Sequence, residues 1–109
     1  MSLPQQLPEP VRGALEAALA GDTDGFLAPF GESGAVDDWG RLFTGQGSIR
    51  GWSDNEFVGK QVTLDVTDVR VDGNDVTVTA QVGGNGFNGP SNFVFTVDGD
   101  RISLMRITG

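Results

Sequence analysis

Residues 35–60 read AVDDWGRLFTGQGSIRGWSDNEFVGK, and this stretch decides the fold when it is taken together with the elements predicted on either side of it. Its first part, residues 35–44, predicts a short strand or an irregular pair of strands. Residues 46–52 predict a brief helix, whose two large apolar residues are three positions apart and therefore share one face. Residues 53–59 predict a turn that directs Phe57 inward.

Two helices are predicted before this stretch. Apolar residues recur at helical spacing over residues 11–19, and Pro10 suits the first turn of that helix. Gly21 then ends the helix, and the side chain of Asp22 can cap a second one. The second helix is short because Pro29 limits its length. Its apolar residues are Phe26, Leu27 and Phe30.

Four runs of alternating apolar and polar residues follow the stretch and predict strands. They lie at residues 62–71, 76–82, 93–97 and 102–108. In the first run the apolar parity changes at Thr67-Asp68, which predicts a β-bulge, a feature that bends a sheet. Short turns between the runs indicate antiparallel pairing. The predicted fold class is therefore α+β, with N-terminal helices packed on a strongly curved, mostly antiparallel sheet.

The composition bounds the class of protein. A chain of 109 residues forms one domain, residues 1–109, and the Pro-rich residues 1–9 are expected to be a flexible lead. The net charge is -8, so the surface repels phosphate backbones and anionic lipid, and neither nucleic acid nor membrane is an expected partner. No apolar run approaches the ~20 residues of a membrane helix. We expect a cytoplasmic protein.

Neither a cofactor nor a metal site is expected from the motifs. Residues 84–89 match GxGxxG by letters, but a dinucleotide-binding motif must open a helix, whereas Pro90 and a predicted strand follow here. The acidic run Asp54-Asn55-Glu56 lacks the spacing of a calcium loop, and a helix cap or turn is its simpler interpretation. The chain has no Cys, so neither a disulfide nor a thiolate site is possible, and no His, which removes the commonest general base at neutral pH.

Asp37-Asp38 is the candidate for acid–base chemistry. Adjacent residues of a strand point to opposite faces, so only one of the two carboxylates looks inward. An inward Asp38 in an apolar cone would have its pKa raised by desolvation and could act as a general base. The alternative, which we favour, is a surface pair with Arg41 as its partner.

Large apolar side chains are the candidates for a ligand-binding wall. These are Phe26, Trp39, Trp52, Phe57, Phe93, Phe95 and Met105. Most aromatic residues at such spacing simply fill a core, and that interpretation is favoured by about two to one. A pocket in this fold would nevertheless be lined by the same residues.

Three phrases carry a resemblance to a known family: LAGDTDGFLAPF (19–30), DWGRLFTGQGSIRGW (38–52) and FVFTVDGDRISLMRI (93–107). With the order of elements, they resemble the nuclear transport factor two-like, SnoaL-like superfamily, whose fold is a cone. The resemblance implies a pocket inside the cone. It also implies activities as different as ketosteroid isomerisation, polyketide cyclisation, epoxide hydrolysis and non-catalytic binding. The phenol that ketosteroid isomerases use is excluded, because the chain has no Tyr.

Three functions remain open at this point. The leading one is the binding of a small hydrophobic molecule inside the cone, and the second is an isomerase, cyclase or hydrolase with Asp38 as general base. The third is an interaction protein without a ligand. Apolar residues are expected on the convex face of the sheet at Val94, Ile102 and Leu104, which predicts a homodimer through that face.

Overall fold

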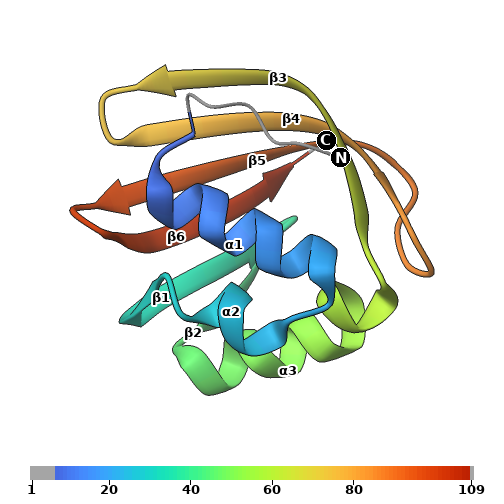
Figure 1. Ribbon diagram of the computed structural model, residues 1–109. Coiled ribbons are helices and arrows are strands. Elements are labelled where there is room, and N and C mark those ends of the chain that lie inside the picture. The colour runs from blue at the N-terminus through green and yellow to red at the C-terminus, as the bar shows by residue number, and fades with distance from the viewer. Residues whose placement is uncertain (1–6, 109) are drawn as a thin grey trace.

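The chain folds into a curved sheet with its helices gathered on the concave side, as the computed structural model of residues 7–108 shows (Figure 1). In chain order the elements are α1 (Glu9–Ala20), α2 (Thr23–Leu27), β1 (Phe30–Asp38), β2 (Arg41–Thr44), α3 (Gln46–Glu56), the 3-10 turn η1 (Val58–Lys60), β3 (Thr63–Asp72), β4 (Asp75–Gly83), β5 (Gly89–Asp98) and β6 (Arg101–Thr108). The α+β class and the mostly antiparallel sheet are confirmed.

The six strands lie in the order β2-β1-β6-β5-β4-β3. All neighbours pair antiparallel except β1 and β6, which are parallel. The predicted bulge is present, because the register of β3 against β4 shifts between Val66 and Asp68. After this shift Val69 pairs with Val78 and Val71 with Val76, so both lie on the same face of the sheet as those buried residues of β4 despite the change of parity in the sequence.

The helices at the start of the chain form for the reasons that the sequence indicates. Gly21 ends α1 in the left-handed conformation, with φ of 75°, and an Asp22 carboxylate oxygen accepts a hydrogen bond from the Gly25 N–H at 3.0 Å. Phe30 was predicted to belong to the second helix, but it is the first residue of β1, because α2 already ends before Pro29. Within residues 7–108, no helix is long and apolar enough to cross a bilayer.

The lead and the start of α1 differ from the sequence prediction. Residues 1–6 of the predicted flexible lead lie outside the described part of the chain. Leu7 is buried in the core, and α1 begins at Glu9. The last part of the predicted lead is therefore packed and helical.

The helix α3 is longer than predicted. Residues 53–56, expected to form a turn, continue it to Glu56, and the Phe57 N–H still donates to the Ser53 carbonyl at 3.0 Å. Ile49 and Trp52 are buried on its inner face, and Phe57 is buried just after its end. The helix therefore lies along β1 and β2 and closes one side of the cone.

The last strand corrects one further expectation. Ile102 was placed on the convex face, but its side chain is completely buried in the core. The cause is a register shift between Thr96 and Val97, which breaks the simple alternation of β5 against β6. Met105 and Ile107 face the core as expected, and Leu104 is half-buried on the other face.

Candidate functional site

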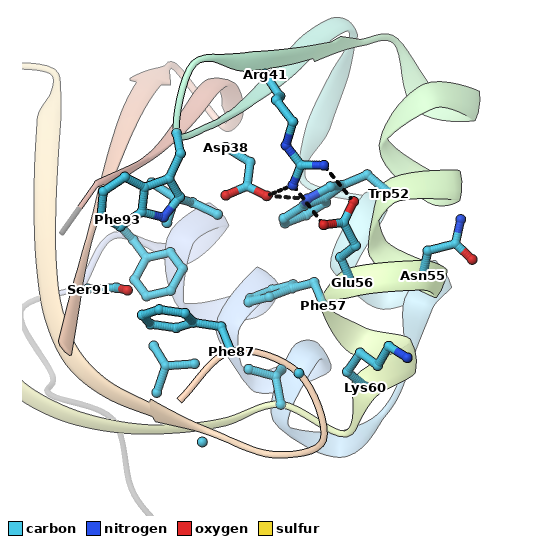
Figure 2. A pocket seen from close by; sticks show the side chains of 16 residues that line it. Asp38, Arg41, Trp52, Asn55, Glu56, Phe57, Lys60, Phe87, Ser91 and Phe93 are labelled. Atoms are coloured by element: carbon cyan, nitrogen blue, oxygen red, sulfur yellow. Dashed lines mark hydrogen bonds and ion pairs between the residues drawn. The ribbon is translucent and has the colours of Figure 1, made fainter. Parts of the chain in front are cut away.

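A cavity of about 390 Å³ lies between α3, η1, residues 84–88 and the sheet (Figure 2). Its volume is within the range of ~300–1,000 Å³ that is usual for small-molecule sites. The apolar part of its lining consists of Trp39, Trp52, Phe57, Val62, Val82, Phe87, Phe93 and Ile107. The polar side chains of the lining are Asp38, Arg41, Asn55, Glu56, Lys60 and Ser91. The cone is therefore open on one side and is not filled by its own side chains.

The aromatic wall is held by contacts between rings. Trp52 and Phe57 stack with their centroids 5.1 Å apart, and Phe57 contacts Phe93 across the cavity at 6.1 Å. Phe26 lies behind them, 5.3 Å from Phe57 and 6.4 Å from Trp52. Aromatic pairs at these separations stabilise the fold by more than their buried area alone would give, so the wall keeps its shape.

Asp38 ends β1 with its carboxylate at the edge of the cavity (Figure 2). The oxygen Oδ2 accepts hydrogen bonds from Trp52 Nε1 at 3.0 Å and from Arg41 Nη2 at 2.5 Å. Only 13% of the side chain is exposed. The other oxygen, Oδ1, has no hydrogen-bond partner among residues 7–108. The carboxylate is thus fixed through one oxygen and free to accept a hydrogen bond through the other.

Arg41 connects two carboxylates. Its guanidinium donates to both oxygens of Glu56, at 3.1 and 2.7 Å, and to Asp38. These hydrogen bonds, that with Glu56 first, raise the already high pKa of Arg41, so the guanidinium stays charged at any pH at which the protein is handled. Arg41 was expected as the partner of Asp38, and this ion pair is present. The ion pair with Glu56 joins β2 to the end of α3. It was not predicted, because residues 53–59 were expected to form a turn.

Asp37 and Asp38 point to different surroundings, as expected of adjacent strand residues. Asp37 accepts a hydrogen bond from the Gly40 N–H at 2.8 Å and lies 3.8 Å from Arg106 Nε. Asp37 therefore stabilises the turn between β1 and β2, and only Asp38 belongs to the cavity.

Residues 84–88, between β4 and β5, cover part of the cavity. Gly86 and Phe87 contribute to its lining, and the segment is fastened to η1 by the Asn85 N–H, which donates to the Lys60 carbonyl at 2.8 Å. Asn85 Nδ2 also donates to Gln61 Oε1 at 3.0 Å. The GxGxxG letters lead into β5 and not into a helix, which rules out the dinucleotide motif at this place.

Ser91 is a lining residue that the sequence interpretation missed. It lies on β5 with 2% of its surface exposed, and its hydroxyl has no partner among the described residues. The signal that could have found it is parity, because Ser91, Phe93 and Phe95 occupy alternate positions of one strand and share its buried face. The prediction began the strand at Phe93 and left residue 91 in a loop.

The structure divides the candidate residues into two groups. Asp38, Trp39, Trp52, Phe57 and Phe93 all line the cavity. Phe26, Phe95 and Met105 are fully buried in the core and lie outside the lining. Phe26 supports the wall from behind through Trp52 and Phe57, and a ligand in the cavity would not reach these three buried side chains.

Comparison with known proteins places the fold. The sequence matches no protein-family model and no curated protein sequence. Among solved structures, a protein from Sinorhizobium meliloti assigned to the polyketide cyclases is 25% identical, with a TM-score of 0.82 over 94% of this chain and 95% of its own. A nuclear transport factor two-like protein of unknown function from Cytophaga hutchinsonii is 12% identical, with a TM-score of 0.80 over 97% and 93%.

A third structure, the Δ5-3-ketosteroid isomerase from a Mycobacterium species, is 14% identical, with a TM-score of 0.76 over 92% of this chain and 89% of its own. At these identities the agreement concerns the path of the backbone and not the residues of the site. The chain therefore has the cone fold of the nuclear transport factor two-like, SnoaL-like superfamily.

Proposed function

We propose that the protein binds a small, mostly apolar molecule in the cavity between α3 and the sheet. The observation that carries this proposal is the cavity itself, about 390 Å³ in volume, with an aromatic wall and the fixed carboxylate of Asp38 at its edge. Apolar surface around a few placed polar groups is the usual composition of a ligand site. Two proteins with this fold are a protein assigned to the polyketide cyclases and a ketosteroid isomerase, and their names denote polyketide and steroid substrates, which are mostly apolar.

The first test is a panel of steroids, polyketides, terpenoids and acyl compounds. Binding of each compound is measured by thermal unfolding and by tryptophan fluorescence of the protein. Trp39 and Trp52 line the cavity, so occupation of the cavity changes their emission. A compound at 100 times its dissociation constant stabilises the folded state by about 2.7 kcal/mol. Absence of any shift across all four chemical classes would contradict the proposal.

A pair of matched variants shows whether a bound compound occupies this cavity. Val82 is buried in its lining, and Val82→Phe is expected to fill the space and to weaken binding by at least tenfold, since the ligand and the new ring compete for the same volume. Val94→Phe introduces the same ring on the opposite, half-buried face of the sheet and should leave binding unchanged. Equal effects of both variants would place the compound elsewhere.

A second candidate function is an isomerase, cyclase or hydrolase in which Asp38 is the general base. The specific observation that favours it is the state of the carboxylate, whose Oδ2 is fixed by Trp52 and Arg41 while Oδ1 is free to take a proton. A base must be held within hydrogen-bond reach of the proton that it removes, and the cavity brings a carbonyl or epoxide compound to that position.

Asp38→Asn tests this second candidate. The amide keeps the size of the side chain but has little basicity, so turnover of any substrate found in the panel should fall by ~10²–10⁴-fold while binding is largely retained. Turnover is measured beside the dissociation constant of the same compound. If turnover is the same in the variant, Asp38 is not the base, and the binding function alone remains.

A further inference from the structure

Two buried serine hydroxyls, those of Ser53 and Ser91, have no hydrogen-bond partner among residues 7–108, and of the two only Ser91 lines the cavity. Its hydroxyl is buried on the core face of β5, lines the cavity, and finds no donor or acceptor among residues 7–108. Figure 2 shows its oxygen directed from the strand towards the cavity, beside the ring of Phe93. Buried polar groups nearly always have a partner, and leaving one unpaired costs ~1–3 kcal/mol. A partner is therefore to be sought inside the cavity.

The free oxygen of Asp38 is the second unpaired acceptor of the lining, and the sheet fixes its distance from Ser91. Asp38 is opposite Ile107 on β6, and Ile107 is opposite Phe93 on β5. Ser91 lies two residues along β5 from that row. With strands ~4.8 Å apart and a rise of ~3.4 Å per residue, the Cα atoms of Asp38 and Ser91 are separated by roughly 12 Å.

The space between the two polar groups is apolar. Ile107 and Phe93 occupy the row that connects them, and Phe57 contacts Phe93 from the other side. Side chains stand roughly perpendicular to a sheet, so the oxygens of Asp38 and Ser91 are separated by about as much as their Cα atoms. After a hydrogen bond of ~2.8 Å is allowed at each end, a molecule with two oxygens roughly 6 Å apart spans the interval. An ionised carboxylate can only accept, so the ligand group at Asp38 must donate, whereas a serine hydroxyl can do either.

We propose that the cavity is specific for an uncharged, two-ring apolar molecule with a hydroxyl that donates to Asp38 Oδ1 and a second oxygen that pairs with Ser91 Oγ. This inference rests on the proposed binding function and adds its chemical class. The lining contains two carboxylates, Asp38 and Glu56, and two cationic groups, Arg41 and Lys60, which balance each other. A neutral ligand leaves this balance intact.

The test compares naphthalene, 2-naphthol and 2,6-dihydroxynaphthalene, three compounds with the same apolar body and increasing numbers of hydroxyls. Their dissociation constants are measured by titration calorimetry with the wild-type protein and with Ser91→Ala. Each hydroxyl should tighten wild-type binding by about fivefold. In Ser91→Ala, 2,6-dihydroxynaphthalene should weaken to the level of 2-naphthol, while naphthalene is unaffected.

Ser53→Ala is the matched control. Ser53 is also buried with an unpaired hydroxyl, but it lies on α3 outside the lining of the cavity. Both substitutions remove a hydroxyl that has no partner in the fold, so both variants should remain folded, and only Ser91→Ala should remove the advantage of the second hydroxyl. This pair separates an effect on the ligand from an effect on packing.

Two outcomes would contradict the inference in different ways. If 2,6-dihydroxynaphthalene binds no more tightly than naphthalene, or if its advantage persists in Ser91→Ala, the cavity binds apolar molecules but Ser91 does not select them. If none of the three compounds binds, the inferred ligand class is wrong, whereas the proposed binding function fails only when the panel of steroids, polyketides, terpenoids and acyl compounds also gives no shift.

Discussion

Trp39 adopts a backbone conformation that large side chains avoid. It is the first residue of the two-residue turn between β1 and β2, with φ of 54°, and Gly40 follows with φ of 91°. Such turns require positive φ at both positions, and Asn-Gly is the usual sequence. A bulky residue in the left-handed region is strained by ~1–2 kcal/mol. The indole is nevertheless placed at the cavity, with 59% of its surface exposed.

Replacement of Trp39 should therefore separate stability from binding. Trp39→Asn suits the left-handed conformation, and we expect it to raise the free energy of unfolding by about 1 kcal/mol while it weakens binding of any compound that occupies the cavity. Urea denaturation and calorimetry measure the two effects. Trp39→Phe is the control, since it keeps the strain and an aromatic ring and should change both quantities little. A loss of stability in Trp39→Asn would show that the indole stabilises the turn.

Two glycines, Gly59 in η1 and Gly51 in the middle of α3, are expected to respond oppositely to the same substitution. A Cβ on Gly59 would lie 1.8 Å from the Asp54 carbonyl oxygen, so the backbone of η1 packs directly on the last turn of the helix. A Cβ on Gly51, on the exposed side of α3, would meet nothing within 4 Å. The first glycine is required by a close approach, whereas the second only weakens the helix.

Gly59→Ala should lower the free energy of unfolding by about 3 kcal/mol, because the backbone must move to admit the methyl group. Gly51→Ala should raise it by about 1 kcal/mol, the usual difference between glycine and alanine inside a helix. Both values come from urea denaturation at one temperature. If Gly59→Ala is tolerated without loss, the junction between α3 and η1 is less tightly packed than the structure indicates.

At the scale of elements, the sequence predicts those features of the strands and helices that depend on neighbouring residues alone. The bulge in β3 was visible because Val66 and Val69 differ in parity, and the cap of α2 because Asp22 follows a helix-ending glycine. The extension of α3 was not visible, since Ser-Asp-Asn-Glu favours a turn locally. Burial of Ser53 and the ion pair of Glu56 with Arg41 keep this segment helical.

Of the site, the sequence predicted Asp38 and most of the large aromatic residues of the lining. Trp52, Phe57 and Phe93 were identified as wall candidates from their size and spacing, and they do line the cavity. Phe95 has the same parity as Phe93 but lies deeper in the core, and one-dimensional spacing cannot distinguish these depths. Ser91 was missed because its strand begins earlier than the apolar alternation, at Gly89.

The quaternary state is a prediction for the whole molecule. With Ile102 in the core, the convex face of the sheet retains Val94 and Leu104 as half-buried apolar residues, and we predict that two copies associate through them. Sedimentation velocity at micromolar concentration should then show a dimer, and Leu104→Glu a monomer, because the charge cannot be desolvated in the interface. A wild-type protein that sediments as a monomer would contradict the prediction.

The position of β1 in the sheet has a consequence for how the chain reaches its native state. β1 pairs with β2 on one side and with β6 on the other, and β6 follows only after α3 and three further strands. The hairpin of β1 and β2 can form early, but its inner edge has no neighbour until β6 docks in parallel alongside it. Such distant pairing costs loop entropy before any contact compensates for it, so its formation is slow. We expect the closure of this seam to limit the folding rate, and the unclosed edge of β1 to be the surface through which partly folded chains aggregate.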